Sequence, residues 1–233
     1  MAIPLGAKFH EHLASNWEEK YTRYSFMRRL DLFNTILDHS VQSGQCWLDL
    51  GCGSGTLTGE LIKRGASVVA LDGSPSMLAA ARKIHGKIGS SVSFRQGDAQ
   101  DLSWSLPGVF DGVLCSSVIE YVEDENELIR QVSRVLKDDG LFIISVPPKK
   151  SLVRMFQKLI RTFFKLLGQD KYAYLEVSRF EIAPALVASW LKKANFRLSR
   201  ISGFDPILPS FLIKIIRPAL LICEAKKNKK IEK

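Results

Sequence analysis

Three glycines two residues apart, Gly51, Gly53 and Gly55, follow a short apolar run and precede an expected helix. Glycine allows a tight turn and lets a ligand approach the backbone, and the start of a helix offers N–H groups that lack helical partners. The spacing differs from the G-x-G-x-x-G of dinucleotide sites, because the position of its last glycine holds Thr56. The pattern is instead D-x-G-x-G-x-G, beginning at Asp49, and it indicates a loop that binds a ligand.

Acidic side chains follow two further expected strands. Asp72 ends the second strand, where a carboxylate can accept two hydrogen bonds from ribose hydroxyls and would repel a 2′-phosphate. Asp98 lies in the segment Gly97–Leu102, where it could accept from an adenine amino group while the Ala99 N–H binds a ring nitrogen. A fourth segment, Cys115–Val122, would face the reacting end of the ligand. Taken alone, Asp72 could equally be a solvated strand end.

Alternating strands and helices must position these side chains. The expected strands are Cys46–Leu50, Ser67–Leu71, Val92–Gln96, Phe110–Cys115, Leu141–Pro147, Phe196–Ile201 and Ala219–Ala225. The expected helices are Thr56–Arg64, Pro75–His85 with Ser74 as its N-cap, Glu125–Leu136 and Ala183–Ala194. The alternation predicts right-handed βαβ units, and the last two strands predict a hairpin that adds an antiparallel edge. The predicted fold class is α/β, a doubly wound, mostly parallel seven-stranded sheet with an antiparallel last strand.

The length of 233 residues favours one domain over the whole chain. Within it we expect a helical N-terminal cap at residues 1–45 and insertions at residues 148–178 and 205–218 on the substrate side.

Four ordered motifs resemble the class I S-adenosylmethionine-dependent methyltransferases. LDLGCGSG matches the first motif of the family, ALDGSPSML the second and GDAQDL the adenine-side segment, while FDGVLCSSVIEYVED and LKDDGLFIISVP match later motifs. The resemblance is close over Trp47–Pro147 and looser in the flanks. A single glycine loop would be weak evidence, but four segments at the ends of successive strands are specific. The resemblance implies a Rossmann-like fold that uses S-adenosyl-L-methionine and releases S-adenosyl-L-homocysteine.

The resemblance also implies roles for single residues. The three glycines would pack against the methionine part of the cofactor, with Asp49 holding the loop or the cofactor's ammonium and Asp72 holding the ribose. Met77 would lie against the adenine, although a methionine on an amphipathic helix is usually a core residue. The predicted cofactor-binding residues are Asp49, Gly51, Cys52, Gly53, Gly55, Asp72, Gly73, Met77, Asp98, Ala99, Gln100 and Cys115.

The chemistry implied is in-line displacement of a methyl group from a sulfonium, for which the protein aligns the reactants and excludes water. A hydroxyl nucleophile can also need a general base. The predicted catalytic residues are Glu120, Tyr121 and Tyr21, with Tyr24, His10 and His12 as further candidates. The alternative for Glu120 is an ordinary salt bridge. No cluster of metal ligands is visible, so no metal is predicted, and a carboxylate-bound Mg²⁺ stays open.

The segment Pro147–Tyr172 combines apolar and basic residues at helical spacing. Its apolar positions are Leu152, Met155, Phe156, Leu159, Ile160, Phe163, Phe164 and Leu167. Its basic positions are Lys149, Lys150, Arg154, Lys158, Arg161 and Lys165. A helix with an apolar face and an all-basic polar face suits an anionic membrane surface, which predicts membrane contact through residues 149–167. The alternative is a lid helix with solvated lysines.

The net charge of +9 permits nucleic acid, an anionic membrane or acidic small molecules as partners. Nucleic acid is disfavoured, because the basic residues share a helix with large aliphatic ones and lack the exposed aromatic pattern of strand-based RNA readers. The N-terminus lacks a secretory signal, and the four cysteines are scattered. These features predict a cytoplasmic protein, with a peripheral position at the inner face of the membrane as the finer expectation.

The chain resembles bacterial methyltransferases of quinone biosynthesis and of other small molecules, with Asn195 where their late helix commonly has glycine. The first hypothesis is methyl transfer to a small, apolar or lipid-like acceptor of the quinone- or isoprenoid-precursor type. The second is a methyltransferase of a soluble metabolite that uses the basic helix as a lid. The third is a non-catalytic cofactor-binding or RNA-associated protein. The identity of the acceptor and the atom that is methylated stay open.

Overall fold

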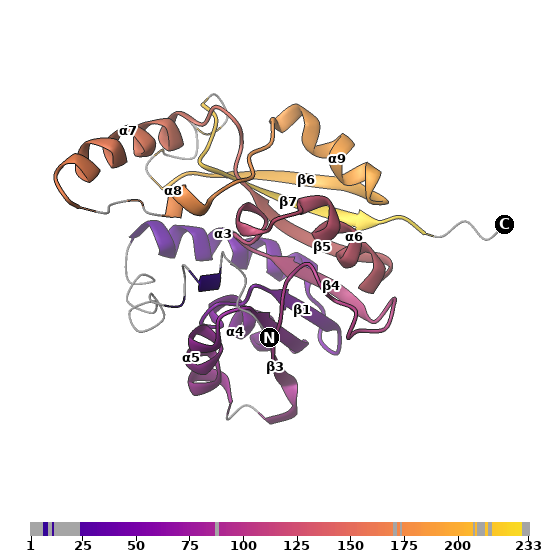
Figure 1. The fold of residues 1–233 in the computed structure, drawn as a ribbon. Coiled ribbons are helices and arrows are strands. Elements are labelled where there is room, and N and C mark those ends of the chain that lie inside the picture. The colour runs from indigo at the N-terminus through magenta and orange to yellow at the C-terminus, as the bar shows by residue number, and fades with distance from the viewer. Residues whose placement is uncertain are drawn as a thin grey trace.

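The computed structural model describes residues 7, 8, 11, 24–86, 89–169, 172, 174–206, 208, 213 and 216–229. A twisted central sheet lies between helices on both of its faces (Figure 1). Much of the predicted N-terminal cap, including Tyr21, His10 and His12, lies outside the described residues, and so does half of the insertion at 205–218.

Seven strands form one sheet in the order β3-β2-β1-β4-β5-β7-β6. They are β1 (Cys46–Leu50), β2 (Ser67–Asp72), β3 (Val92–Gln96), β4 (Phe110–Cys115), β5 (Leu136–Val146), β6 (Phe196–Phe204) and β7 (Leu220–Lys227). The strands β1 to β5 pair in parallel, and β7 is antiparallel to both β5 and β6. This arrangement confirms the predicted fold class.

The position of the antiparallel strand differs from the expectation of an antiparallel edge. The last strand, β7, lies inside the sheet between β5 and β6, and β6 forms the edge. The residue types account for the order, because β7 begins with the apolar run Leu220–Cys223 whereas β6 contains Arg197, Ser199 and Arg200; seven of the eight residues of β7 are buried, and β6 is buried only at its two ends. A run that is apolar on both sides, like the first half of β7, is best covered inside a sheet.

The helices in the described part of the chain are α3 (Tyr24–Ser40), α4 (Thr56–Lys63), α5 (Pro75–His85), α6 (Glu125–Val135), α7 (Leu152–Leu166), α8 (Tyr174–Val177) and α9 (Val187–Lys193). The side chain of Ser74 accepts from the Met77 N–H at 3.1 Å, which is the predicted N-cap of α5. The helix expected at Ala183–Ala194 is instead a 3₁₀ turn, Pro184–Leu186, followed by α9.

Two hydrophobic clusters fill the space between the sheet and the helices. On one face, Phe33 of α3 and Leu61 of α4 pack with Trp47 of β1. On the other face, Leu128 of α6 and Val187 of α9 pack with Phe142 of β5. The last apolar residues of β1, β2 and β4, which are Leu50, Leu71 and Cys115, belong to the second of these clusters, and the loops that follow the three strands carry the predicted motifs.

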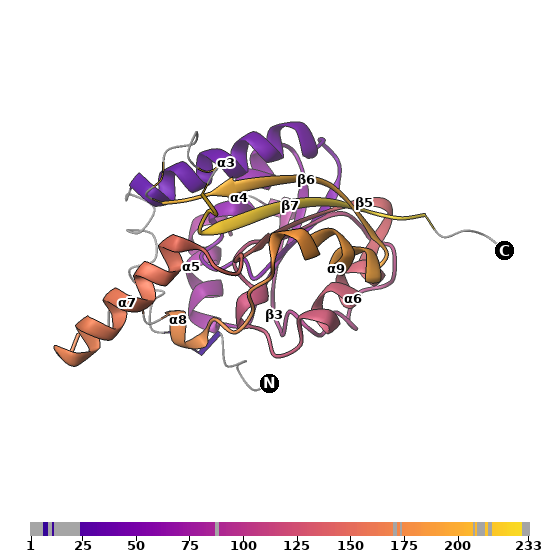
Figure 2. The same cartoon turned by 90° about the horizontal axis from the view of Figure 1, so that it is seen from above.

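The helix α7 projects from the carboxyl edge of the sheet as a rod, which is clearest from above (Figures 1 and 2). Its apolar residues Met155, Leu159 and Phe163 are 56–68% exposed. No helix in the described ranges has the length and apolar character needed to cross a membrane.

Candidate functional site

The glycine loop turns directly from β1 toward the neighbouring strand β2. The N–H groups of Gly51 and Cys52 both donate to the Leu71 carbonyl, at 2.7 and 2.9 Å. Gly51 has a φ of +74°, and a Cβ added there would lie 2.2 Å from Cγ2 of Val118, in the loop after β4. Glycine is required at this position both by the left-handed backbone and by the approach of Val118.

Asp72 is fixed beside this loop by backbone donors. Its Oδ2 accepts from the Gly53 N–H and its Oδ1 from the Ser74 N–H, each at 2.8 Å. The acid at the end of β2 therefore lies next to the glycine loop, as the motifs predict. Gly73 lies between Asp72 and Ser74, at the entrance to α5.

Asp49 is fully enclosed below the loop. Its Oδ2 accepts from the Thr58 hydroxyl of α4 at 2.6 Å. The pKa of the Asp49 carboxyl is raised to about 7, mainly by burial; the hydrogen bond from Thr58 opposes the rise, and the nearby charge of Asp72 adds to it. A carboxyl with a pKa near neutrality can gain its charge when a cation binds nearby.

The third predicted segment lies after β3. Oδ1 of Asp98 accepts from the Gln100 N–H at 2.9 Å, and Oε1 of Gln100 accepts from the Asp124 N–H at 2.6 Å. This chain of bonds ties the segment to the start of α6. Ala99 packs against the main hydrophobic cluster.

Three other predicted cofactor residues are buried. Met77 is 1% exposed on α5, in keeping with the core alternative. Cys52 and Cys115 are free thiols whose pKa is raised well above the ordinary value, mainly by burial. Both thiols are therefore protonated near neutral pH.

The predicted catalytic residues Glu120 and Tyr121 lie in a 3₁₀ turn, Ile119–Tyr121, after β4. Oε2 of Glu120 accepts from two nitrogens of the Arg154 guanidinium, both at 3.2 Å, and from the Ser178 hydroxyl at 2.8 Å. Burial and the neighbouring Glu120 raise the pKa of Tyr121 well above its ordinary value. Glu120 thus forms the ion pair named as its alternative, and catalysis by either side chain stays a prediction. The structure does not describe Tyr21.

Two residues missed by the motif analysis lie at the same edge of the sheet. Nη2 of Arg29, on α3, donates to the hydroxyls of Ser116 and Ser117 at 2.6 and 2.8 Å. Among the described residues, Arg29 forms no ion pair with an acidic side chain. Glu11 hydrogen-bonds the hydroxyls of Ser74 and Ser76 at the start of α5. The only sequence signal for Arg29 is a basic residue within a helical, aromatic-rich segment.

Comparisons with known proteins agree with this geometry. A family model described as a methyltransferase domain matches residues 48–144. A ubiquinone biosynthesis O-methyltransferase of Xanthomonas oryzae pv. oryzae (strain PXO99A) is 33% identical over 180 residues, covering 75% of this chain and 71% of that protein. The chain belongs to the class I S-adenosylmethionine-dependent methyltransferases. Its cofactor is therefore S-adenosyl-L-methionine.

Further relatives of this methyltransferase cover more of its length. A ubiquinone biosynthesis O-methyltransferase of Pseudomonas aeruginosa (strain LESB58) is 28% identical over 206 residues, covering 86% of this chain and 87% of the relative. The fold is shared with a Burkholderia thailandensis 1,6-didemethyltoxoflavin-N1-methyltransferase that was solved with S-adenosylhomocysteine. That structure has a TM-score of 0.61 and 16% identity, and the match covers 98% of this chain and 93% of that one.

The residues of the methyltransferase site fit this cofactor. The hydroxyl of Ser54, between two glycines of the loop, is buried without a hydrogen-bond partner in the described part of the chain. A buried donor without a partner is costly, and a ligand in the loop can satisfy it. When bound, S-adenosylmethionine supplies a methyl group activated by a positively charged sulfur. The described residues include no group of three His, Cys, Asp or Glu side chains arranged for a metal ion.

Proposed function

We propose that this methyltransferase transfers a methyl group to a hydroxyl oxygen of a small, apolar acceptor of the quinone- or isoprenoid-precursor type, at a membrane surface. Two relatives named as ubiquinone biosynthesis O-methyltransferases support oxygen as the methylated atom and a quinone precursor as the acceptor class. The alignment with the Pseudomonas relative spans most of both chains, so it includes the flanks in which acceptor choice is expected.

The exposed apolar face of α7 is the observation that carries the proposal. Its basic residues point back to the body, where Lys158 pairs with Glu181 at 3.0 Å and Lys165 with Glu176 at 3.1 Å. The expected all-basic polar face is thus largely neutralised, because residues 174–181 supply acids that the helix lacks. Lys149 and Lys150 keep no acidic partner in the described ranges. Membrane contact is then mainly apolar, with a small basic contribution.

The roles of single residues form part of this proposal. Asp72 binds the ribose hydroxyls, the glycine loop packs against the methionine part, and Asp49 balances the ammonium of the cofactor. The Arg29 guanidinium, held by Ser116 and Ser117 at the end of β4, binds the cofactor's carboxylate. The segment Gly97–Gln100 borders the adenine, and the acceptor hydroxyl lies against the loop that carries Glu120.

Incubation with methyl-labelled S-adenosylmethionine and a lysate of the host tests the acceptor class. We expect label in the organic phase after partition, and none with Asp72→Ala. Label confined to the aqueous phase would exclude a lipid-like acceptor. It would support the second candidate, methylation of a soluble metabolite with α7 as a lid, which the ion pairs between α7 and residues 174–181 favour.

Flotation with phosphatidylglycerol vesicles tests the membrane contact. We expect the wild-type protein to float and Leu159→Glu/Phe163→Glu to stay in solution, because charged side chains oppose burial in an apolar phase. Leu106→Glu is the matched control, since Leu106 is 76% exposed and lies far from α7 in sequence. Equal flotation of all three proteins would show that membrane binding does not depend on the apolar face of α7.

A further inference from the structure

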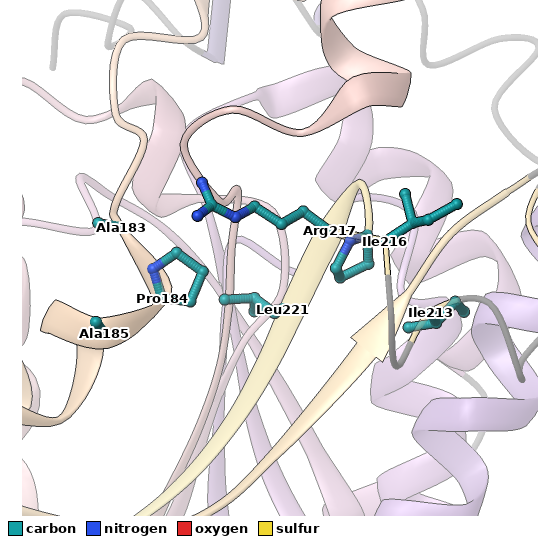
Figure 3. Close-up of a pocket in the computed structure, with 8 residues that line it drawn as sticks. Ala183, Pro184, Ala185, Ile213, Ile216, Arg217 and Leu221 are labelled. Atoms are coloured by element: carbon teal, nitrogen blue, oxygen red, sulfur yellow. The ribbon is translucent and has the colours of Figure 1, made fainter.

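A cavity of about 380 Å³, open to the surface, lies between residues 183–185 and the stretch that leads into β7 (Figure 3). Its walls are apolar apart from one arginine, and they include Ala183, Pro184, Ile216, Pro218 and Leu221. Pockets that bind small molecules have volumes of roughly 300–1,000 Å³ and mostly apolar linings. The cavity therefore has the size and character of a site for an apolar ligand group.

The polar residue of the lining, Arg217, has its charge anchored outside the apolar walls. Its Nη1 donates to the carbonyl oxygen of Lys149 at 3.2 Å. Its side chain extends above Pro184 and Leu221 in the close-up (Figure 3). Because long basic side chains commonly bury their methylene stem and keep their charged end outside, Arg217 adds apolar surface to the wall.

The cavity lies at the same edge of the sheet as the methyltransferase site. Leu221 pairs with Val146 at the carboxyl end of β5, and the next strand, β4, ends at Cys115. Neighbouring strands are about 4.8 Å apart, so the strand of Leu221 lies about 10 Å from the strand that leads into the loop of Glu120. A ligand of modest length can span that interval.

One chain segment connects the two places. The N–H of Arg179 donates to the carbonyl oxygen of Glu120 at 2.7 Å, beside the site. Three residues further, the N–H of Ile182 donates to the Pro147 carbonyl at 3.0 Å, and the next residue is Ala183 of the cavity wall. The segment Arg179–Ala183 therefore runs from the reacting edge to the cavity.

We propose that this cavity binds the apolar tail, a prenyl or alkyl chain, of the molecule whose head is methylated beside the Glu120 loop. The inference rests on the proposed function, because it assigns tail and head to one acceptor. It explains why the second insertion contributes its aliphatic residues Ile213 and Ile216 at this place. Residues around Ala185 then set acceptor specificity through chain length, while the cofactor is held elsewhere.

Farnesol, a prenyl chain without an aromatic head, tests the cavity by calorimetric titration in the presence of S-adenosylhomocysteine. We expect Ala185→Trp, which fills the cavity from an exposed position, and Ile216→Asp, which adds a charge, to weaken farnesol binding at least about tenfold. The loss of contact with about two methylene groups is sufficient for such a change. Ala188→Trp is the control, because Ala188 is exposed on α9 and does not line the cavity. All variants should bind S-adenosylhomocysteine like the wild type.

A pair of dihydroxybenzenes, one bare and one with a farnesyl chain, links the cavity to turnover. We expect KM for the farnesylated compound to be lower in the wild type, and Ala185→Trp to remove that advantage without changing KM for the bare compound. Equal farnesol affinity of wild type, Ala185→Trp and Ile216→Asp would overturn the tail site even if methylation proceeds. Methylation of neither compound, with farnesol binding weakened by the two variants, would contradict the proposed acceptor class and leave the apolar site standing.

Discussion

The guanidinium of Arg154 and the carboxylate of Glu120 form a buried ion pair, with both hydrogen bonds at 3.2 Å. Arg154 lies in the first turn of α7 and Glu120 in the loop after β4. The pair therefore fastens the projecting helix to the loop beside which the acceptor is proposed to lie. The Ser178 hydroxyl donates to the same carboxylate oxygen at 2.8 Å and completes its surroundings.

Replacing one partner of this pair should cost far more than replacing both. Arg154→Met leaves the Glu120 carboxylate buried without its cation, so we expect a loss of about 3–5 kcal/mol in the free energy of unfolding. The double variant Arg154→Met/Glu120→Gln should recover much of that loss. Urea denaturation measures both. Lys158→Met, the control, removes a half-exposed partner of Glu181 and should cost less than about 1 kcal/mol. Equal losses in Arg154→Met and Lys158→Met would mean that Arg154 does not neutralise a buried charge.

Gly51→Ala should lower the free energy of unfolding for two reasons, the left-handed backbone at Gly51 and the overlap of the new Cβ with Val118. Gly108→Ala is the matched control, because Gly108 has a φ of +66° and no atom lies within 4 Å of an added Cβ. We expect it to cost about 1–2 kcal/mol from the left-handed backbone alone. Gly51→Ala adds the overlap with Val118, and we expect a further ~1–3 kcal/mol by thermal or urea unfolding.

A second substitution separates the two contributions at Gly51. Gly51→Ala/Val118→Ala removes the overlapping Cγ2 and should regain part of the lost stability. No recovery in the double variant would mean that contact with Val118 is not what excludes a side chain.

Asp72→Asn should weaken cofactor binding while the fold persists. The amide keeps one acceptor oxygen but loses the charge, and a hydrogen bond to a charged group contributes about 1.5–3 kcal/mol, so we expect Kd for S-adenosylhomocysteine to rise about tenfold to a hundredfold. Calorimetric titration measures it. Asp101→Asn is the control, because Asp101 is exposed and accepts from the Ser103 N–H. An unchanged affinity of Asp72→Asn for S-adenosylhomocysteine would contradict the assignment of Asp72 to the ribose site.

Asp49 should make the ligand-free protein less stable as pH rises. Its pKa is about 7 in the folded chain against an ordinary 3.8, so the folded state favours the protonated carboxyl. Ionising the buried carboxyl lowers the free energy of unfolding. This loss is absent below the ordinary pKa, grows between pH ~4 and ~7, and is complete above the folded-state pKa, with an upper limit of about 4 kcal/mol. Urea unfolding at several pH values should show the stability of wild type falling relative to Asp49→Asn across this window. A difference that does not vary with pH would mean that Asp49 is charged throughout.

Local patterns were sufficient for most elements of the sheet. Val92–Gln96 and Phe110–Cys115 form strands with the predicted bounds, and Ser74 caps α5 as expected. Each of these depends on residues close together in the sequence. The end of the helix near Leu136 was wrong by one residue, because Leu136 begins β5 rather than ending α6.

The orientation of α7 and the residues around the site depend on distant partners. Periodicity shows that α7 has an apolar and a basic face, but only Glu120, Glu176 and Glu181 decide that the basic face is turned to the body. Arg29 meets Ser116 across 87 positions of sequence, with no local pattern to signal the contact. The motifs at strand ends could be predicted, whereas such contacts depend on the folded chain.

The inward position of β7 also has a consequence for the order in which the chain can assemble. A growing polypeptide presents β5 and then β6 before β7 has been synthesised, yet β6 joins the sheet only through β7. Until then β5 is an exposed edge with unpaired backbone groups and a run of apolar residues, a surface that invites intermolecular pairing. We therefore expect nascent chains that end before residue 220 to expose this edge of β5 and to associate more readily than the complete chain.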